Sequence, residues 1–272
     1  MIKTILVPIC HEQGADERVE YAIELANKFD AHIKVLHILT PLTTMVSGTH
    51  ADFTYSIEAY NAYQVEAEKE ADNLKEKYED KLNKSGVRYD WCQEKGDLVS
   101  HLYIYSRASD ISIISQKGEG FDDVLDYMND FIIGSGLPVI AIPQKGVKDF
   151  SLNNILIAWD GSREAARATH DALPLLKLAD KVTVLTVSDD KNMDVPEADI
   201  CIHLARHAVN TEALTLSNRV PTSQRIIETA ESSNADLIVA GAWGHKRLRE
   251  IIFGGVTKTL LSNQKRAVFI TH

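Results

Sequence analysis

The sequence predicts an α/β fold made of two doubly wound, five-stranded parallel-sheet domains in tandem. Three observations carry this prediction. Short apolar runs alternate with amphipathic stretches, the same order of elements occurs twice, and the second copy begins about 150 residues after the first. Strands that alternate with helices pair mostly in parallel, because right-handed crossovers return the chain across the sheet. Apolar runs without polar alternation are typical of strands covered on both faces.

The first copy begins with a predicted strand at 4–9. Val19, Ala22, Ile23 and Ala26 then recur at the spacing of one helix face. A second strand is predicted at 31–38. It precedes a long helix with apolar residues every three or four positions from 63 to 82, and Gly86 is placed where a C-terminal cap belongs. The remaining strands of this copy are predicted, with helical stretches between them, at 87–91, 110–115 and 138–143.

The second copy repeats this order. Its strands are predicted at 154–159, 181–187, 215–219, 236–241 and 267–271, and its first two helices over about 165–176 and 198–217. The polar segment 144–153 joins the copies, so we expect domains at 1–146 and 152–272. The alternative is one continuous α/β domain with ten strands, and the recurring element order favours two units.

Composition excludes several classes of protein. Apolar residues make up 44% and charged residues 25% of the 272 positions, which is typical of a globular chain. The net charge of −10 argues against sequence-independent nucleic-acid binding, which depends on cations that neutralise phosphates. Three cysteines without a CxxC pair argue for a reducing compartment and against a structural metal site. With no signal peptide or membrane span recognisable, we expect a cytoplasmic protein.

Ligands of open parallel sheets bind beyond the carboxyl ends of the strands. In the second copy these positions hold Asp160-Gly161-Ser162 and, later, Gly241-Ala-Trp-Gly244, nine residues, and Gly254-Gly255-Val256. Glycines let a backbone approach a ligand, and a helix start favours phosphate. The nine intervening residues hold His245, Lys246, Arg247 and Arg249, an island of positive charge. The pattern therefore predicts phosphate binding, with a purely structural loop as the alternative.

Asp160 follows a strand at the same predicted edge. A carboxylate there can accept hydrogen bonds from a nucleoside, as acidic residues do in other nucleotide folds. The alternative for this segment is an ordinary turn in which Ser162 caps the next helix.

This combination of element order, the ILIAWDGS start, the ADLIVAG strand and the glycine pattern resembles the universal stress protein family in its tandem form. The resemblance implies a Rossmann-like fold and binding of ATP or another adenine nucleotide, with Mg²⁺ as a candidate companion. By match to the family motif, Asp160 and Val187 would lie near the adenosine and Gly241 near the ribose. The phosphates would be surrounded by Gly244, Gly254, Gly255 and Val256. Gly255 replaces the usual Ser or Thr, so one hydroxyl donor is lost.

The resemblance also implies partners. Family members commonly dimerise through their last strand, so the two domains could pair as an intramolecular pseudo-dimer, and two chains could form a homodimer. We expect the second domain to bind an adenine nucleotide and to act as a stress-responsive regulator. The alternatives are a slow ATP hydrolase or phosphotransferase using the same pocket, and a scaffold with vestigial pockets.

Other candidates in the sequence are less specific. The first copy has no aspartate after its first strand, and its Gln116 segment lacks the glycine spacing, so we expect it to bind no nucleotide and to serve as a packing partner or to hold another ligand. His203 and His207 have a metal-binding spacing near Cys201, but no HExxH glutamate accompanies them. We interpret them as ordinary solvated or core histidines.

Overall fold

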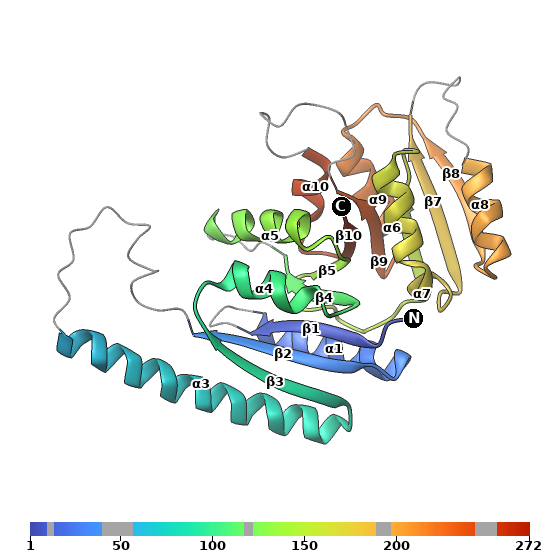
Figure 1. The fold of residues 1–272 in the computed structure, drawn as a ribbon. Coiled ribbons are helices and arrows are strands. Elements are labelled where there is room, and N and C mark those ends of the chain that lie inside the picture. Colours follow the sequence, from blue (N-terminus) through green and yellow to red (C-terminus); the bar gives the residue numbers. More distant parts are fainter. Residues whose placement is uncertain (10–13, 40–56, 117–121, 189–196, 243–254) are drawn as a thin grey trace. The chain divides into compact units, whose positions relative to one another are not determined.

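A computed structural model describes residues 1–9, 14–39, 57–116, 122–188, 197–242 and 255–272 (Figure 1). The chain divides into two compact units, Ile2–Ile113 and Ile114–His272, with Met1 grouped with the second. The domains expected at 1–146 and 152–272 were defined by the sequence repeat, whereas these units are defined by compactness. The expected domain boundaries therefore stay a prediction. None of the described helices is long and apolar enough to cross a bilayer.

The first unit contains the first four strands of the chain, which pair in parallel in the order β3-β2-β1-β4. Its long helix ends beside Gly86, whose φ of +72° is the left-handed conformation expected of a glycine cap. This helix lies along β2 and β3 (Figure 1). The elements are β1 (Thr4–Ile9), α1 (Ala15–Phe29), β2 (His32–Leu39), α3 (Ile57–Ser85), β3 (Arg88–Lys95), α4 (Leu98–Ser106) and β4 (Ile111–Ser115), whose last two residues belong to the second unit.

The second unit holds the remaining strands in the order β5-β10-β9-β6-β7-β8. All of its described pairs are parallel except β5 with β10, which is antiparallel. Its elements are α5 (Asp122–Ser135), β5 (Val139–Ile142), β6 (Asn154–Ala158), α6 (Arg163–Asp171), α7 (Leu173–Leu176), β7 (Lys181–Val187), α8 (Glu197–Arg206), β8 (Thr211–Leu216), α9 (Thr222–Ser232), β9 (Leu237–Gly241), α10 (Gly255–Leu260) and β10 (Ala267–Thr271). The predicted α/β class with mostly parallel pairing is therefore confirmed.

The repeat is visible in individual hydrogen bonds. Asp110, just before β4, accepts hydrogen bonds from the backbone N–H groups of Lys3 (2.6 Å) and Thr4 (2.8 Å) at the start of β1. Asp236, just before β9, accepts in the same way from Asn154 N–H (2.9 Å) at the start of β6. A carboxylate thus ties the fourth strand to the first in both copies.

The helix and the strand predicted within 198–219 differ from the structure. The sequence periodicity predicts a helix over 198–217 and a strand at 215–219, but α8 ends at Arg206 and β8 already begins at Thr211. Ala208 turns the chain with φ +62°, and the Val209 N–H bonds back to Leu204 O at 3.1 Å. A helix end is usually signalled by glycine in this left-handed position, and alanine gives no such signal.

A buried glutamine connects the two copies inside the second unit. Gln116 follows β4, and its Nε2 donates to Ala141 O (3.1 Å) in β5 and to Arg266 O (2.6 Å) before β10. Its Oε1 accepts from Gln264 N–H at 2.8 Å, and the Gln264 side chain accepts in turn from Gln144 N–H at 2.8 Å. We call these contacts the glutamine clasp. They flank the antiparallel pair β5–β10, which joins the last strand of one copy to the last strand of the other.

Candidate functional site

Three of the predicted ligand contacts lie at the carboxyl ends of three neighbouring strands. The chain leaves β6 toward β7 on one side and later returns to β9 on the other. An open parallel sheet forms its ligand crevice where the strand order reverses in this way, which here is between β6 and β9. Asp160 follows β6, Gly241 ends β9, and Val187 ends β7. The fold therefore brings three of the seven predicted residues to one edge of the sheet.

The segment from Asp160 to Ser162 is a tight turn into α6. The Asp160 Oδ1 atom accepts a hydrogen bond from Ser162 N–H at 2.9 Å, and Gly161 between them has φ +72°. Ser162 is the N-cap of α6, because its Oγ accepts from Ala165 N–H at 3.1 Å. The capping role for Ser162 is thus confirmed. Asp160 itself is exposed, so the turn holds its carboxylate in a fixed place at the surface.

Gly241 has a structural task that the sequence pattern did not reveal. A Cβ atom at this position would lie 2.4 Å from the Glu164 carbonyl carbon and 2.6 Å from Ala165 N. The space of the absent side chain is therefore filled by the backbone of α6, not by open crevice. A glycine of this kind allows close packing of helix on strand, and it sets how near the start of α6 lies to the end of β9.

Glu164 lies in the first turn of α6, beside Gly241. Its side chain is only 8% exposed, and it pairs with the Nε of the exposed Arg163. The hydrogen bond to Glu164 raises the pKa of the Arg163 guanidinium. A buried carboxylate is tolerated when it is paired in this way and lies at a helix N-terminus. The pair lies entirely within the first turn of α6 and compensates the burial of the Glu164 carboxylate.

The predicted phosphate residues are described only in part. Gly255 is exposed at the start of α10, and no atom lies within 4 Å of the position that a Cβ would occupy. Val256 follows it in the first turn and is half-buried. Gly244, Gly254 and the cationic residues between them lie outside the described residues. Their role around a phosphate stays a prediction.

Two buried polar atoms lie one residue away from predicted contacts. The Nε1 atom of Trp159 has no hydrogen-bond partner among the described residues, although its side chain is buried and it directly precedes Asp160. The same holds for Oγ1 of the buried Thr186, which directly precedes Val187. Buried polar atoms without partners are rare in folded proteins, and a water or a bound molecule normally satisfies them. Sequence reasoning did not identify the Thr186 hydroxyl as a candidate, because burial is what distinguishes it.

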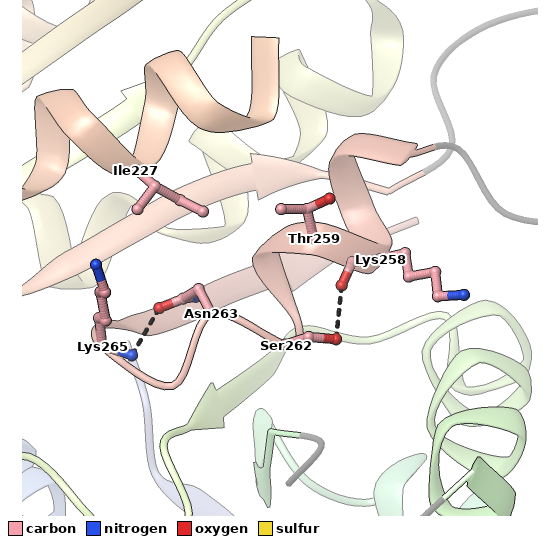
Figure 2. Close-up of a pocket in the computed structure, with 6 residues that line it drawn as sticks. All are labelled: Ile227, Lys258, Thr259, Ser262, Asn263 and Lys265. Carbon is pink, nitrogen blue, oxygen red and sulfur yellow. Dashed lines mark hydrogen bonds between the residues drawn. The ribbon is translucent and has the colours of Figure 1, made fainter. Parts of the chain in front are cut away.

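A shallow hollow elsewhere in the second unit does not belong to this site. It has a volume of about 400 Å³ and lies between α9 and α10 (Figure 2). Three of its residues, Ser262, Asn263 and Lys265, lie between α10 and β10, so it lies toward the amino end of that strand. Lys265 Nζ is paired with Glu231 at 2.5 Å, and Ser262 Oγ donates to Lys258 O at 3.0 Å. Several of its polar side chains are therefore already engaged by neighbouring protein groups.

Comparison with known proteins assigns the chain to a family. The model of the universal stress protein family matches residues 1–99 and 203–272, which together make up more than half of the chain. The chain belongs to the universal stress protein family. The match includes strands of both copies, so it confirms the resemblance drawn from the glycine pattern and the element order. Comparison with curated proteins gave no match.

Solved structures show the tandem universal stress protein fold over the full chain. A universal stress protein from Archaeoglobus fulgidus DSM 4304 is 17% identical, with a TM-score of 0.76, over 98% of this chain and 95% of the other. A functionally unknown protein from Pseudomonas aeruginosa PAO1 is 16% identical, with a TM-score of 0.59, over 99% and 92%. At these identities the likeness shows the fold alone.

Proposed function

We propose that the second copy of this universal stress protein binds an adenine nucleotide and that the protein acts as a nucleotide-dependent regulator. The observation that carries the proposal is the convergence of Asp160, Val187 and Gly241 at the strand-order reversal between β6 and β9. In this proposal the Asp160 carboxylate accepts hydrogen bonds from the nucleoside, Val187 packs near it, and Gly241 lies near the ribose.

The phosphate tail is assigned to Gly244, Gly254, Gly255 and Val256. Open space around the missing Cβ of Gly255 supports this part of the proposal, because a phosphate oxygen can then approach its backbone N–H. A universal stress protein family protein from Arabidopsis thaliana has been solved with AMP bound. That observation concerns the plant protein, and the proposal here rests on the residues of this chain.

Calorimetric titration with ATP, ADP and AMP tests the proposal. We expect the full chain to bind one nucleotide and Asp160→Ala to weaken binding. Asp160→Asn keeps an oxygen that can accept the hydrogen bond from Ser162 N–H, but it loses the negative charge. This variant therefore distinguishes a direct contact of Asp160 with the ligand from its role in the turn. Asp97→Asn is the matched control, because Asp97 caps α4 in the first unit by accepting from Ser100 N–H at 2.8 Å. Equal affinity for ATP in Asp160→Ala and the parent chain would remove Asp160 from the site.

Measuring ATP hydrolysis distinguishes a nucleotide-binding regulator from an enzyme. Phosphoryl transfer needs carboxylates that hold a metal and a positioned nucleophile. We propose binding without fast turnover, so phosphate release with ATP and Mg²⁺ should stay at the level seen without protein. Sustained hydrolysis that disappears in Asp160→Ala would establish the enzymatic alternative instead.

We also propose that the paired last strands make the chain an internal pseudo-dimer. The antiparallel pairing of β5 with β10 and the glutamine clasp support this proposal. Because each of these strands already has the other as its partner, a homodimer would need a different surface. Light scattering at increasing concentration tests this, with a mass near 30.3 kDa expected for a single chain.

A further inference from the structure

Three histidines from separate parts of the second copy are in ring contact. The rings of His170 and His203 lie edge to face with centroids 4.8 Å apart, and those of His203 and His207 are also 4.8 Å apart. We call these three residues the histidine cluster. His170 is exposed, and His203 and His207 are half-buried, so all three rings reach solvent.

The secondary structure explains how the cluster forms. His170 lies in the last turn of α6, His203 lies in the last turn of α8, and His207 follows directly after that helix. The last turn of a helix carries exposed carbonyl groups and a partial negative charge, which favour a cation. The ring contacts therefore bring three imidazole side chains together near the C-terminal turns of two helices.

The separations of neighbouring rings are close to those in a metal complex. With a metal–nitrogen distance of about 2.0–2.1 Å and tetrahedral angles, two coordinated imidazole rings have centroids about 5 Å apart. The rings contact each other edge to face, and among the described residues no three ligating side chains converge on one point. Closing the cluster around an ion therefore requires rotation of the rings, chiefly of the exposed His170.

The groups around the histidine cluster show which side chains are available to coordinate a metal ion. Cys201 lies two residues before His203, but burial raises the pKa of its thiol, which disfavours the thiolate that a metal needs. Asp171 is engaged by Arg167 Nε at 3.5 Å and by Thr271 Oγ1 at 3.3 Å. Arg206 adds a positive charge near His203 that opposes a second cation. Three imidazoles without a thiolate or a carboxylate remain as the donors.

We propose that the histidine cluster binds a divalent transition-metal ion of borderline softness, such as Zn²⁺, Ni²⁺ or Cu²⁺, through His170, His203 and His207. Imidazole nitrogen suits these ions, and an open fourth position remains for water. The site is separate from the proposed nucleotide contacts, since it uses the carboxyl end of α6 whereas Asp160 and Ser162 lie before its amino end. Metal binding would connect α6 to α8.

Burial of His203, with His170, His207 and Arg206 around it, lowers the pKa of its imidazole.

Calorimetric titration of the full chain with Zn²⁺ at pH 7.5 tests the proposal. We expect the cluster of each chain to bind one Zn²⁺ ion. The variants His170→Ala, His203→Ala and His207→Ala should each lower the affinity for this ion by at least about tenfold, because even the loss of an outer-shell partner of a metal ligand has an effect of this size. His101→Ala is the matched control, because His101 lies in α4 of the first unit and contacts Asp97 O at 2.8 Å. His203→Gln provides a conservative second variant should His203→Ala be unstable.

Electron paramagnetic resonance with Cu²⁺ gives a second readout by counting the coordinating nitrogens. We expect three in the parent chain and fewer in His170→Ala. The proposal is overturned if the parent chain takes up no ion, if any cluster variant that folds binds like the parent, or if His101→Ala loses as much affinity as the cluster variants.

Discussion

At the scale of single residues, two glycines of the same signature have different surroundings. The position of a side chain on Gly241 is occupied by the backbone of α6, whereas the position on Gly255 is open. Sequence reasoning assigned both to ligand approach, because a motif shows where a side chain is missing but not what fills the space. Substituting each residue by alanine should therefore separate packing from binding.

Gly241→Ala should destabilise the protein. The added methyl group would lie 2.4–2.7 Å from three backbone atoms of Glu164 and Ala165, so α6 has to move away from β9. Overpacking of this kind costs about 1–3 kcal/mol in the free energy of unfolding. Urea denaturation measures the cost. A variant as stable as the parent chain would show that α6 shifts freely and that the close packing is not needed.

Gly255→Ala should leave the stability unchanged or slightly raised, because no atom is near the new methyl group and alanine favours helix over glycine. ATP binding should weaken, since the methyl group would occupy space assigned to phosphate. Melting temperature and calorimetry on the same sample check both parts. Unaltered ATP affinity in this variant would take Gly255 out of the phosphate site.

At the scale of elements, the sequence predicted the helices and strands whose ends are marked by characteristic residues, such as a polar turn after an apolar run. The strands 4–9, 181–187 and 267–271 are confirmed residue for residue, because buried apolar runs between polar turns leave little choice of boundary. The helix predicted over 165–176 is divided at Ala172 into α6 and α7, with Pro174 in the first turn of α7. The helix predicted over 198–217 was wrong beyond Arg206, because Ala208 made the turn without glycine.

The glutamine clasp belongs to the same scale. In Gln116→Ala, the backbone N–H of Gln264 and the carbonyl of Arg266 lose their side-chain partners. These hydrogen bonds are partly buried, and a fully buried group left without a partner costs about 1–3 kcal/mol, which is an upper bound for each. We expect a lower urea midpoint for this variant and no change for Gln93→Ala, whose side chain lies on the outer strand β3. A clasp variant as stable as the control would show that β5–β10 pairing does not depend on Gln116.

The packing of α6 against α8 through the histidine cluster should depend on pH. The pKa of His203 is lowered by burial and then by His170, His207 and Arg206, so the folded chain resists protonation that the unfolded chain accepts near pH 6.5. The stability present at neutral pH should therefore decrease as the pH falls through about 6.5. Urea unfolding at pH 7.5 and 5.5, with EDTA present, should show a smaller decrease for His203→Gln than for the parent chain. Equal decreases would contradict the assignment.

At the scale of the whole molecule, the repeat was the informative feature of the sequence. It predicted the α/β class, and together with the sequence motifs it predicted the family. The motifs and the resemblance indicated Asp160, Val187 and Gly241, which lie at neighbouring strand ends. It could not predict contacts between distant positions. His170 meets His203 and Gln116 meets Arg266 only after the strands have been ordered in the sheet. Buried atoms such as Trp159 Nε1 likewise become noticeable only once burial is known.

The central claim concerns where an adenine nucleotide binds to the folded chain. A crystal structure of the full chain grown in excess ATP tests it most directly. We predict nucleotide density beyond the ends of β6 and β9, with the nucleoside beside Asp160 and the phosphates at Gly255. An empty crevice at saturating ATP, or density in the first copy alone, would contradict the account.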